Sequence, residues 1–150
     1  MLTNNLLTIT TNLQNQTEFK NLLNKFINEF NINMLEIIGE EGVFKPMKLE
    51  EYLPDPNTYY FYIYQNDTLV GFFGLNNDKE LFTSWIVEFY LEKKYRTTRY
   101  CTNILTFIQN YMNLDNMKYL SIGVFNIKPI IALTKKLGFN PVITTMIKKL

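Results

Sequence analysis

LFTSWIVEFYLEKKYRTTRYCTNIL, residues 81–105, joins three different patterns in one unbroken segment. Residues 81–91 are rich in aromatic and β-branched side chains and predict a strand. This strand would be longer than the usual five or six residues, so it could contain a β-bulge. Residues 93–100 then gather most of the local positive charge, including both arginines of the chain. An apolar stripe at helical spacing follows, so the segment predicts a strand, a basic loop and a helix.

Strands and helices are also predicted on both sides of this segment. A helix is expected at 16–30, and a short second one near 33–40 that Gly39 and Gly42 end. The helix after the basic loop carries its apolar stripe from Cys101 to Met112, and a last helix covers 127–137. The β-branched and aromatic runs predict further strands at 5–11, 58–64, 68–75, 118–124 and 141–148.

The order of these elements predicts the fold class. It runs β-α-α-β-β-β-α-β-α-β, an antiparallel meander that leads into a β-α-β unit. We therefore expect an α/β (α+β) fold with a mixed, mostly antiparallel sheet and helices on both faces. At 150 residues the chain is long enough for one core, so residues 1–150 are predicted to form a single domain.

The composition excludes several function classes. The formal net charge is +1, so nucleic-acid binding is not expected, and the aromatic run at 59–64 is assigned to strand packing. The chain has no histidine, which argues against histidine-based triads and most zinc sites, and no metal is expected. Cys101 is the one cysteine, and neither a signal peptide nor a membrane span is evident. A cytoplasmic protein is therefore expected.

Two segments resemble the GNAT superfamily of acetyl-CoA-dependent N-acetyltransferases. FYLEKKYRTTRYCTNIL, residues 89–105, is similar to the family's cofactor loop, in which Arg/Gln-x-x-Gly-x-Gly/Ala opens a helix. FNIKPIIALTKKLGF, residues 125–139, is similar to its closing segment, in which an Asn precedes a helix that ends in Leu-Gly-Phe. Arg99 and Cys101 stand where the family usually has small residues, and Thr134 stands where many members have a tyrosine that protonates the departing thiolate.

The resemblance implies acetyl-CoA as co-substrate, bound at the basic loop. Backbone N–H groups at a helix N-terminus bind a diphosphate well, because the helix dipole adds partial positive charge there. Arg96 or Arg99 would add a charge-assisted contact. The residues implied in cofactor binding are Leu91, Arg96, Thr97, Thr98, Arg99, Tyr100, Cys101, Thr102 and Asn126. The alternative is a solvated basic turn, in which Arg99 pairs with an acid or blocks the phosphate site.

The acceptor side of such an enzyme needs a general base, and Glu88 is the candidate. It lies in a strand that is otherwise almost free of charge, where burial disfavours the charged carboxylate. The alternative is that Glu88 points to solvent or pairs with a lysine. Tyr90, the second catalytic candidate, shares a strand face with Glu88 and Ser84 unless a bulge intervenes. Cys101, on the apolar face of a helix, is expected to be a core residue and not a nucleophile.

Two functional hypotheses remain at this stage. The first is an N-acetyltransferase that moves acetyl from acetyl-CoA to an amine of an unidentified acceptor. The second is a catalytically inactive GNAT-fold module with a structural or interaction role, for example in a virion or against a host target, since the composition would fit a viral protein. An enzyme needs an open cleft between 88–91 and 121–124, whereas a module could fill it with Tyr90, Phe125 or Arg99. A homodimer through the last strand is possible in either case.

Overall fold

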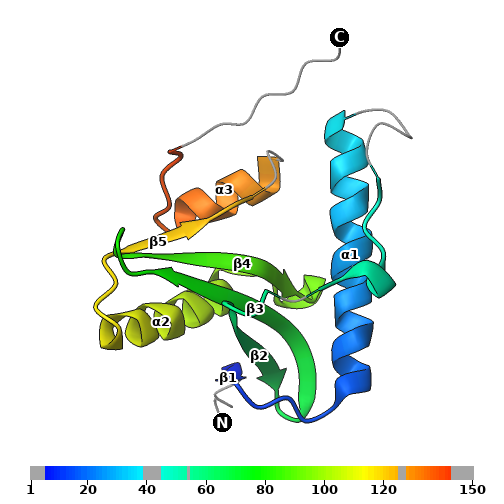
Figure 1. Cartoon of the computed structure of the whole chain (residues 1–150), viewed down its shortest axis with the longest axis horizontal. Helices are drawn as coiled ribbons and strands as arrows, with labels where there is room; N and C mark the ends of the chain where they lie inside the picture. Colours follow the sequence, from blue (N-terminus) through cyan, green and yellow to red (C-terminus); the bar gives the residue numbers. More distant parts are fainter. Residues whose placement is uncertain (1–5, 39–44, 54, 125–127, 143–150) are drawn as a thin grey trace.

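The computed structural model describes residues 6–38, 45–53, 55–124 and 128–142. Ten elements follow one another along these residues (Figure 1). In chain order they are β1 (Thr8–Thr10), α1 (Gln16–Ile38), η1 (Leu49–Glu51), β2 (Tyr59–Gln65), β3 (Thr68–Asp78), β4 (Thr83–Leu91), η2 (Lys93–Tyr95), α2 (Thr98–Leu114), β5 (Tyr119–Ile122) and α3 (Lys128–Lys136). The predicted class, a single α/β domain with a mixed sheet, is confirmed.

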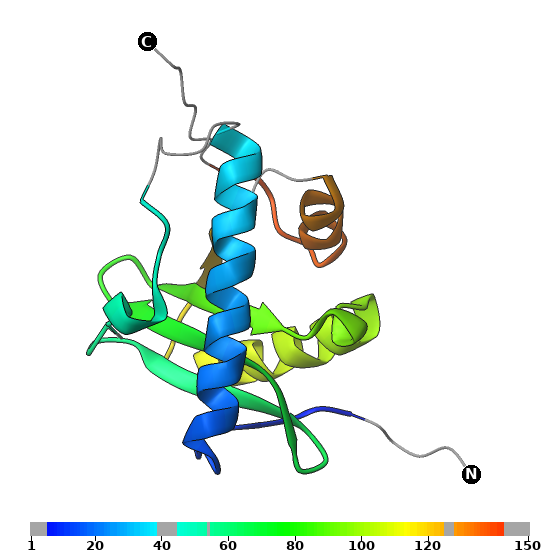
Figure 2. The same ribbon diagram turned by 90° about the vertical axis from the view of Figure 1, so that its right-hand side faces the viewer.

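The sheet has the order β1-β2-β3-β4-β5. Neighbouring strands from β1 to β4 are antiparallel, and β5 runs parallel to β4. Helix α1 packs its apolar stripe against one face, over Phe72 and Tyr90, and Figure 2 shows this helix in front of the sheet. Helix α2 covers the opposite face, over Phe61 and Phe73, and side chains of α3 join the same cluster. Helices therefore lie on both faces, as predicted.

A bulge interrupts β4 at Glu88, as the length of the strand suggested. Val87 pairs with Gly74 and Tyr90 pairs with Phe72, so β4 has one residue more than β3 between these two pairs. Glu88 has a positive φ of 55°, which is uncommon for a residue other than glycine. The extra residue inverts the alternation of the strand. Tyr90 therefore joins the cluster under α1, whereas Ile86 belongs to the cluster under α2.

Glycine at position 71 permits the close approach of β3 to β4 beyond this bulge. A Cβ atom at Gly71 would lie 2.6 Å from the carbonyl oxygen of Tyr90 and 2.9 Å from a side-chain carbon of Leu91. Both contacts are closer than van der Waals packing allows, so a side chain here would displace the end of β4. Gly71 thus contributes to the position of the residues that follow the bulge.

The predicted pair of helices at 16–30 and 33–40 is wrong, because α1 continues without a break to Ile38. Asn31 lies at the expected break, and its side-chain amide bonds to the main chain of Met47. Its Nδ2 donates to the Met47 carbonyl at 2.9 Å, and its Oδ1 accepts from the Met47 N–H at 2.9 Å. An asparagine side chain that is bonded elsewhere does not compete for the helix backbone, so the helix continues.

The remaining predicted elements agree in part. The first strand is confined to β1, shorter than the predicted 5–11. The predicted strand at 141–148 falls mostly outside the described residues. None of the helices in the described ranges has the length and apolar character that a membrane crossing requires.

Candidate active site

Strands β4 and β5 stay paired for only part of the length of β4. Their ladder runs from Thr83–Tyr119 to Ile86–Ile122, where β5 ends while β4 continues to Leu91. A cavity of about 600 Å³ opens at this point. Residues of β4 after the bulge line it, as do Gly123 and Val124 after β5. The predicted opening between 88–91 and 121–124 is therefore present, and Arg99 is not among the residues that line it.

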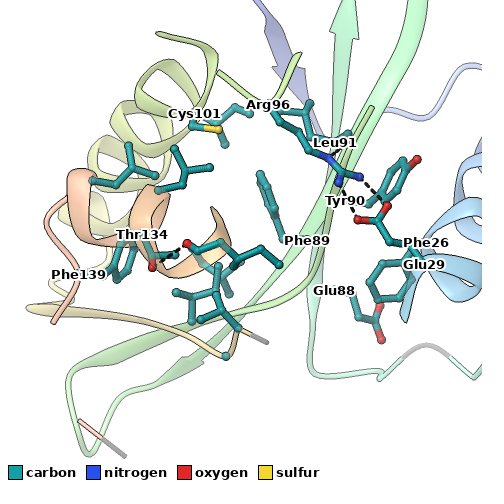
Figure 3. Close-up of a pocket in the computed structure, with 18 of the residues that line it drawn as sticks. Phe26, Glu29, Glu88, Phe89, Tyr90, Leu91, Arg96, Cys101, Thr134 and Phe139 are labelled. Atoms are coloured by element: carbon teal, nitrogen blue, oxygen red, sulfur yellow. Dashed lines mark hydrogen bonds and ion pairs between the residues drawn. The ribbon is translucent and has the colours of Figure 1, made fainter. Parts of the chain in front are cut away.

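The cavity has two walls of different origin (Figure 3). The α1 wall consists of Phe26, Glu29, Phe30 and Asn33 of α1, Met47, and Glu88 and Tyr90 of β4. The α2–α3 wall consists mainly of aliphatic side chains, namely Ile104, Leu105 and Ile108 of α2 and Ile130, Leu133 and Leu137 of α3 and its C-terminal turn. All the charged residues found in the described lining, Glu29, Glu88 and Arg96, lie on the α1 wall or beside it.

Two tyrosines hold Glu88 at the α1 wall. The hydroxyls of Tyr52 and Tyr60 both donate to Oε2 of Glu88, the second at 2.7 Å, and they lie 3.1 Å from each other. Within the described part of the chain, the other carboxylate oxygen, Oε1, accepts no hydrogen bond. Burial raises the pKa of the Tyr60 phenol to about 12, and burial followed by the bond to Glu88 raises the pKa of Tyr52 further. Both phenols therefore remain protonated donors at neutral pH.

Arg96 is committed to contacts inside the fold. Its guanidinium forms a bidentate ion pair with Glu29 of α1, at 2.6 and 2.7 Å, while Nε donates to the Leu91 carbonyl at 2.6 Å. The guanidinium also lies over the Tyr90 ring, 5.3 Å from its centre. The bonds to Glu29 raise the pKa of Arg96 above its ordinary value. Arg96 thus ties the basic loop to α1, and it occupies the carbonyl of Leu91, one of the residues implied in cofactor binding.

The N-terminus of α2 has two open backbone donors. Thr97 caps the helix, since its Oγ1 accepts from the Tyr100 N–H at 3.4 Å and its carbonyl accepts from the Cys101 N–H at 2.9 Å. The N–H groups of Thr98 and Arg99 have no acceptor among the described residues. The side chain of Arg99 is exposed, forms no hydrogen bond or ion pair in the described part of the chain, and lies 6.0 Å from the centre of the Tyr100 ring. Thr102, one turn into the helix, is also exposed.

The positions of Cys101 and Thr134 do not indicate a catalytic role. Cys101 is buried in the cluster under α2 and lines the cavity, and burial raises the pKa of its thiol, which disfavours the reactive thiolate. The Thr134 hydroxyl donates to the carbonyls of Ile130 and Ile131 in its own helix, at 3.1 and 3.0 Å. Asn126 lies outside the described residues, as does Phe125.

Sequence patterns did not reveal the partners of these groups. Tyr52 and Glu29 belong to no local motif, and Tyr60 lies in an aromatic run that indicates only a packed strand. Each reaches the site through a contact between residues distant in sequence. One signal was available: Glu88 is the only charged residue in β4, so a buried polar partner for it was to be expected.

Comparisons with known proteins agree with this geometry. The acetyltransferase (GNAT) domain family matches residues 41–145, whereas no curated protein matches the chain. Among solved structures, the acetyltransferase candidate YycN of Bacillus subtilis is 20% identical, with a TM-score of 0.70 over 95% of this chain and 99% of its own. The ribosomal-protein-S18-alanine N-acetyltransferase of Escherichia coli is 15% identical, with a TM-score of 0.57 over 92% of this chain and 80% of its own.

A third solved structure has an acceptor of another kind. The aminoglycoside acetyltransferase meta-AAC0020, from an uncultured soil metagenomic sample, is 15% identical, with a TM-score of 0.57 over 98% of both chains. At these identities the likeness shows the shared fold alone.

Proposed function

Because the chain belongs to the GNAT family of acetyltransferases, we propose that it transfers the acetyl group of acetyl-CoA to an amine. One observation carries this proposal. The cavity where β4 and β5 separate has Glu88 on one wall, and Arg96 and Cys101, which flank the open N-terminus of α2, also line it. An acyl transfer between a bound thioester and an amine requires a general base and an anion site on the same cavity.

The donor end of the site would be the start of α2. The free N–H groups of Thr98 and Arg99 suit the diphosphate of CoA, and the exposed Arg99 guanidinium adds a positive charge at the same place. From there the pantetheine arm would follow the end of β4 into the cavity. The apolar α2–α3 wall would exclude water from the thioester.

The acceptor end would be the α1 wall. In the proposed step Oε1 of Glu88 takes a proton from the amine, the amine nitrogen bonds to the acetyl carbon, and the C–S bond breaks. Tyr52 and Tyr60 keep the carboxylate in place through Oε2. The CoA thiolate then takes a proton from water, and the proton held by Glu88 neutralises the hydroxide that is left. The Thr134 hydroxyl is not the proton source, since it is bonded to its own helix and is far less acidic than a phenol.

A second candidate function is a GNAT fold without turnover. It is favoured by Arg96, which holds the Leu91 carbonyl and Glu29 in contacts that would compete with the pantetheine arm. This candidate predicts that acetyl-CoA does not bind. It would leave the open amides of α2 without a ligand.

Calorimetric titration with acetyl-CoA distinguishes the two. The parent chain is expected to bind in the micromolar range, and Arg99→Ala is expected to weaken binding about tenfold, the effect of one charge-assisted contact. Lys79→Ala is the matched control, because it removes one exposed positive charge at the opposite end of β4. Absence of binding by the parent would overturn the enzyme hypothesis. Equal losses in both variants would indicate general electrostatics in place of a site on α2.

A further inference from the structure

The α1 wall of the cavity is apolar apart from a few defined groups. Phe26, Phe30 and Met47 line it beside Tyr90, and Asn33 is the neutral amide among the lining residues of α1. Met47 keeps this position because both of its main-chain polar groups are bonded to Asn31 of α1. A molecule bound against this wall would therefore contact rings and a thioether as well as Glu88.

Among the described lining residues, negative charge on this wall is limited to a single available carboxylate. Glu29 is neutralised by the bidentate pair with Arg96, at 2.6 and 2.7 Å. Within the described lining, Glu88 is then the one carboxylate that has no basic partner, and its partners are the phenols of Tyr52 and Tyr60. A second ammonium group on the acceptor would be buried without a counter-charge, which is strongly unfavourable.

This inference rests on the proposed function. We propose that the acceptor is a small primary monoamine whose amino group is attached to an apolar, preferably aromatic, group. Its nitrogen lies at Oε1 of Glu88, and its apolar group packs between Phe26, Phe30 and Met47. Aromatic groups fit because rings pair favourably with the Phe and Met side chains of this wall. Polyamines and aminoglycosides are poor acceptors, since their additional ammonium groups find no carboxylate partner among the lining residues that the structure describes.

Acetylation of a panel of amines tests the acceptor class. The panel contains 2-phenylethylamine as the apolar monoamine, and spermidine and kanamycin as polycations, with thiol release as the readout. For the parent chain we expect kcat/KM for 2-phenylethylamine to exceed that for spermidine by about 100-fold, as for a buried group left without its partner.

A charge-introducing variant makes the test specific to the α1 wall. Met47→Glu adds a second carboxylate to this wall without removing the main-chain bonds to Asn31, and it is expected to lower the ratio of the two kcat/KM values at least tenfold. Leu53→Glu is the matched control, because it adds the same charge at a nearby side chain that is 86% exposed and outside the lining. That control is expected to leave the ratio unchanged.

Titration with acetyl-CoA on the same protein preparations separates the two levels of the proposal. If acetyl-CoA binds but a polycation is preferred, or none of the amines is acetylated, the monoamine class is overturned and the proposed function is not. An unchanged ratio in Met47→Glu would likewise overturn it. If acetyl-CoA does not bind, the acyl transfer itself fails, and the acceptor class fails with it.

Discussion

The two walls of the cavity are built in opposite ways. The α2–α3 wall is a surface of aliphatic side chains on two amphipathic helices, and local spacing determines which residues face inward. The α1 wall holds its polar groups through contacts between residues far apart in the chain, such as Arg96 with Glu29 and Glu88 with Tyr60. A wall of the first kind tolerates exchange of one aliphatic residue for another. In a wall of the second kind each polar group depends on a particular partner.

The largest expected effect of a single substitution on activity is that of Glu88→Gln. It keeps the shape of the side chain and an oxygen that can accept from the two tyrosines, but it removes the base. We expect kcat/KM to fall by about 10²- to 10³-fold, as when a general base is removed, with acetyl-CoA affinity unchanged. Steady-state kinetics and calorimetry on the same preparation measure both.

Glu80→Gln provides the control for this substitution, because Glu80 is an exposed carboxylate at the turn before β4. It should leave kcat/KM within a factor of two of the parent value. If Glu88→Gln retained most of the activity, the carboxylate of Glu88 would have a structural role and not a catalytic one. The difference between the two walls would then have no bearing on catalysis.

A smaller effect, on stability, is expected for Arg96→Ala. The variant loses the ion pair with Glu29, the bond to the Leu91 carbonyl and the contact with the Tyr90 ring. Because Arg96 and Glu29 each remain 31% exposed, the expected loss in the free energy of unfolding is moderate, about 1–3 kcal/mol. Urea denaturation measures this loss.

Arg99→Ala removes the other arginine of the loop and should change the free energy of unfolding by less than about 0.5 kcal/mol, as is usual for an exposed residue. The double variant Arg96→Ala/Glu29→Ala should show coupling between the two positions. Additive losses would mean that the ion pair contributes nothing, and that Arg96 stabilises the loop through Leu91 and Tyr90 alone.

The smallest effect concerns the alkaline limb of stability. The pKa of Tyr60 is about 12 in the folded chain, against about 10 for an unfolded tyrosine. Between these values the unfolded chain releases the phenol proton and the folded chain does not, so stability falls as pH rises from 10 to 12. Tyr60→Phe should remove this dependence, which amounts to less than about 1 kcal/mol for a partly exposed group.

Urea midpoints at pH 9 and pH 11 measure the difference between Tyr60→Phe and the parent. Tyr59→Phe is the matched control, since its neighbouring ring is 59% exposed and forms no hydrogen bond in the described part of the chain. A steeper alkaline loss in Tyr60→Phe than in the parent would contradict the burial of this phenol against Glu88.

Local patterns predicted the parts of the fold that depend on local spacing. The stripe from Cys101 to Met112 placed the buried face of α2, and the length of the 81–91 segment indicated the bulge in β4. The continuity of α1 was not predicted, because an asparagine such as Asn31 taken alone suggests a helix end. In the structure the side-chain amide of Asn31 bonds to the main chain of Met47 instead, and the helix continues. Glu88 was identified from its apolar surroundings, but its two phenol partners were not.

The arginines illustrate the same limit. Composition showed that Arg96 and Arg99 lie in one loop, and family resemblance gave both a role toward phosphate. Only the packing of α1 against the end of β4 distinguishes them, because it brings Glu29 to Arg96 and leaves Arg99 in solvent. A contact with a residue 67 positions away in the sequence cannot be predicted from the spacing of residues within the loop.

The bulge at Glu88 restricts which insertions and deletions β4 can accept during evolution. Before the bulge, even-numbered residues of β4 such as Ile86 face α2, and after it an even-numbered residue, Tyr90, faces α1. Deletion of the Glu88 codon would remove the extra residue and leave Tyr90 and Leu91 on their present faces. Deletion of the Phe89 codon with the bulge retained would exchange the faces of Tyr90 and Leu91, so the basic loop would leave the strand on the wrong side. Substitutions after the bulge can accumulate one at a time, whereas a change in the number of residues there cannot. The number of residues between the bulge and the basic loop is therefore inherited more strictly than their identity.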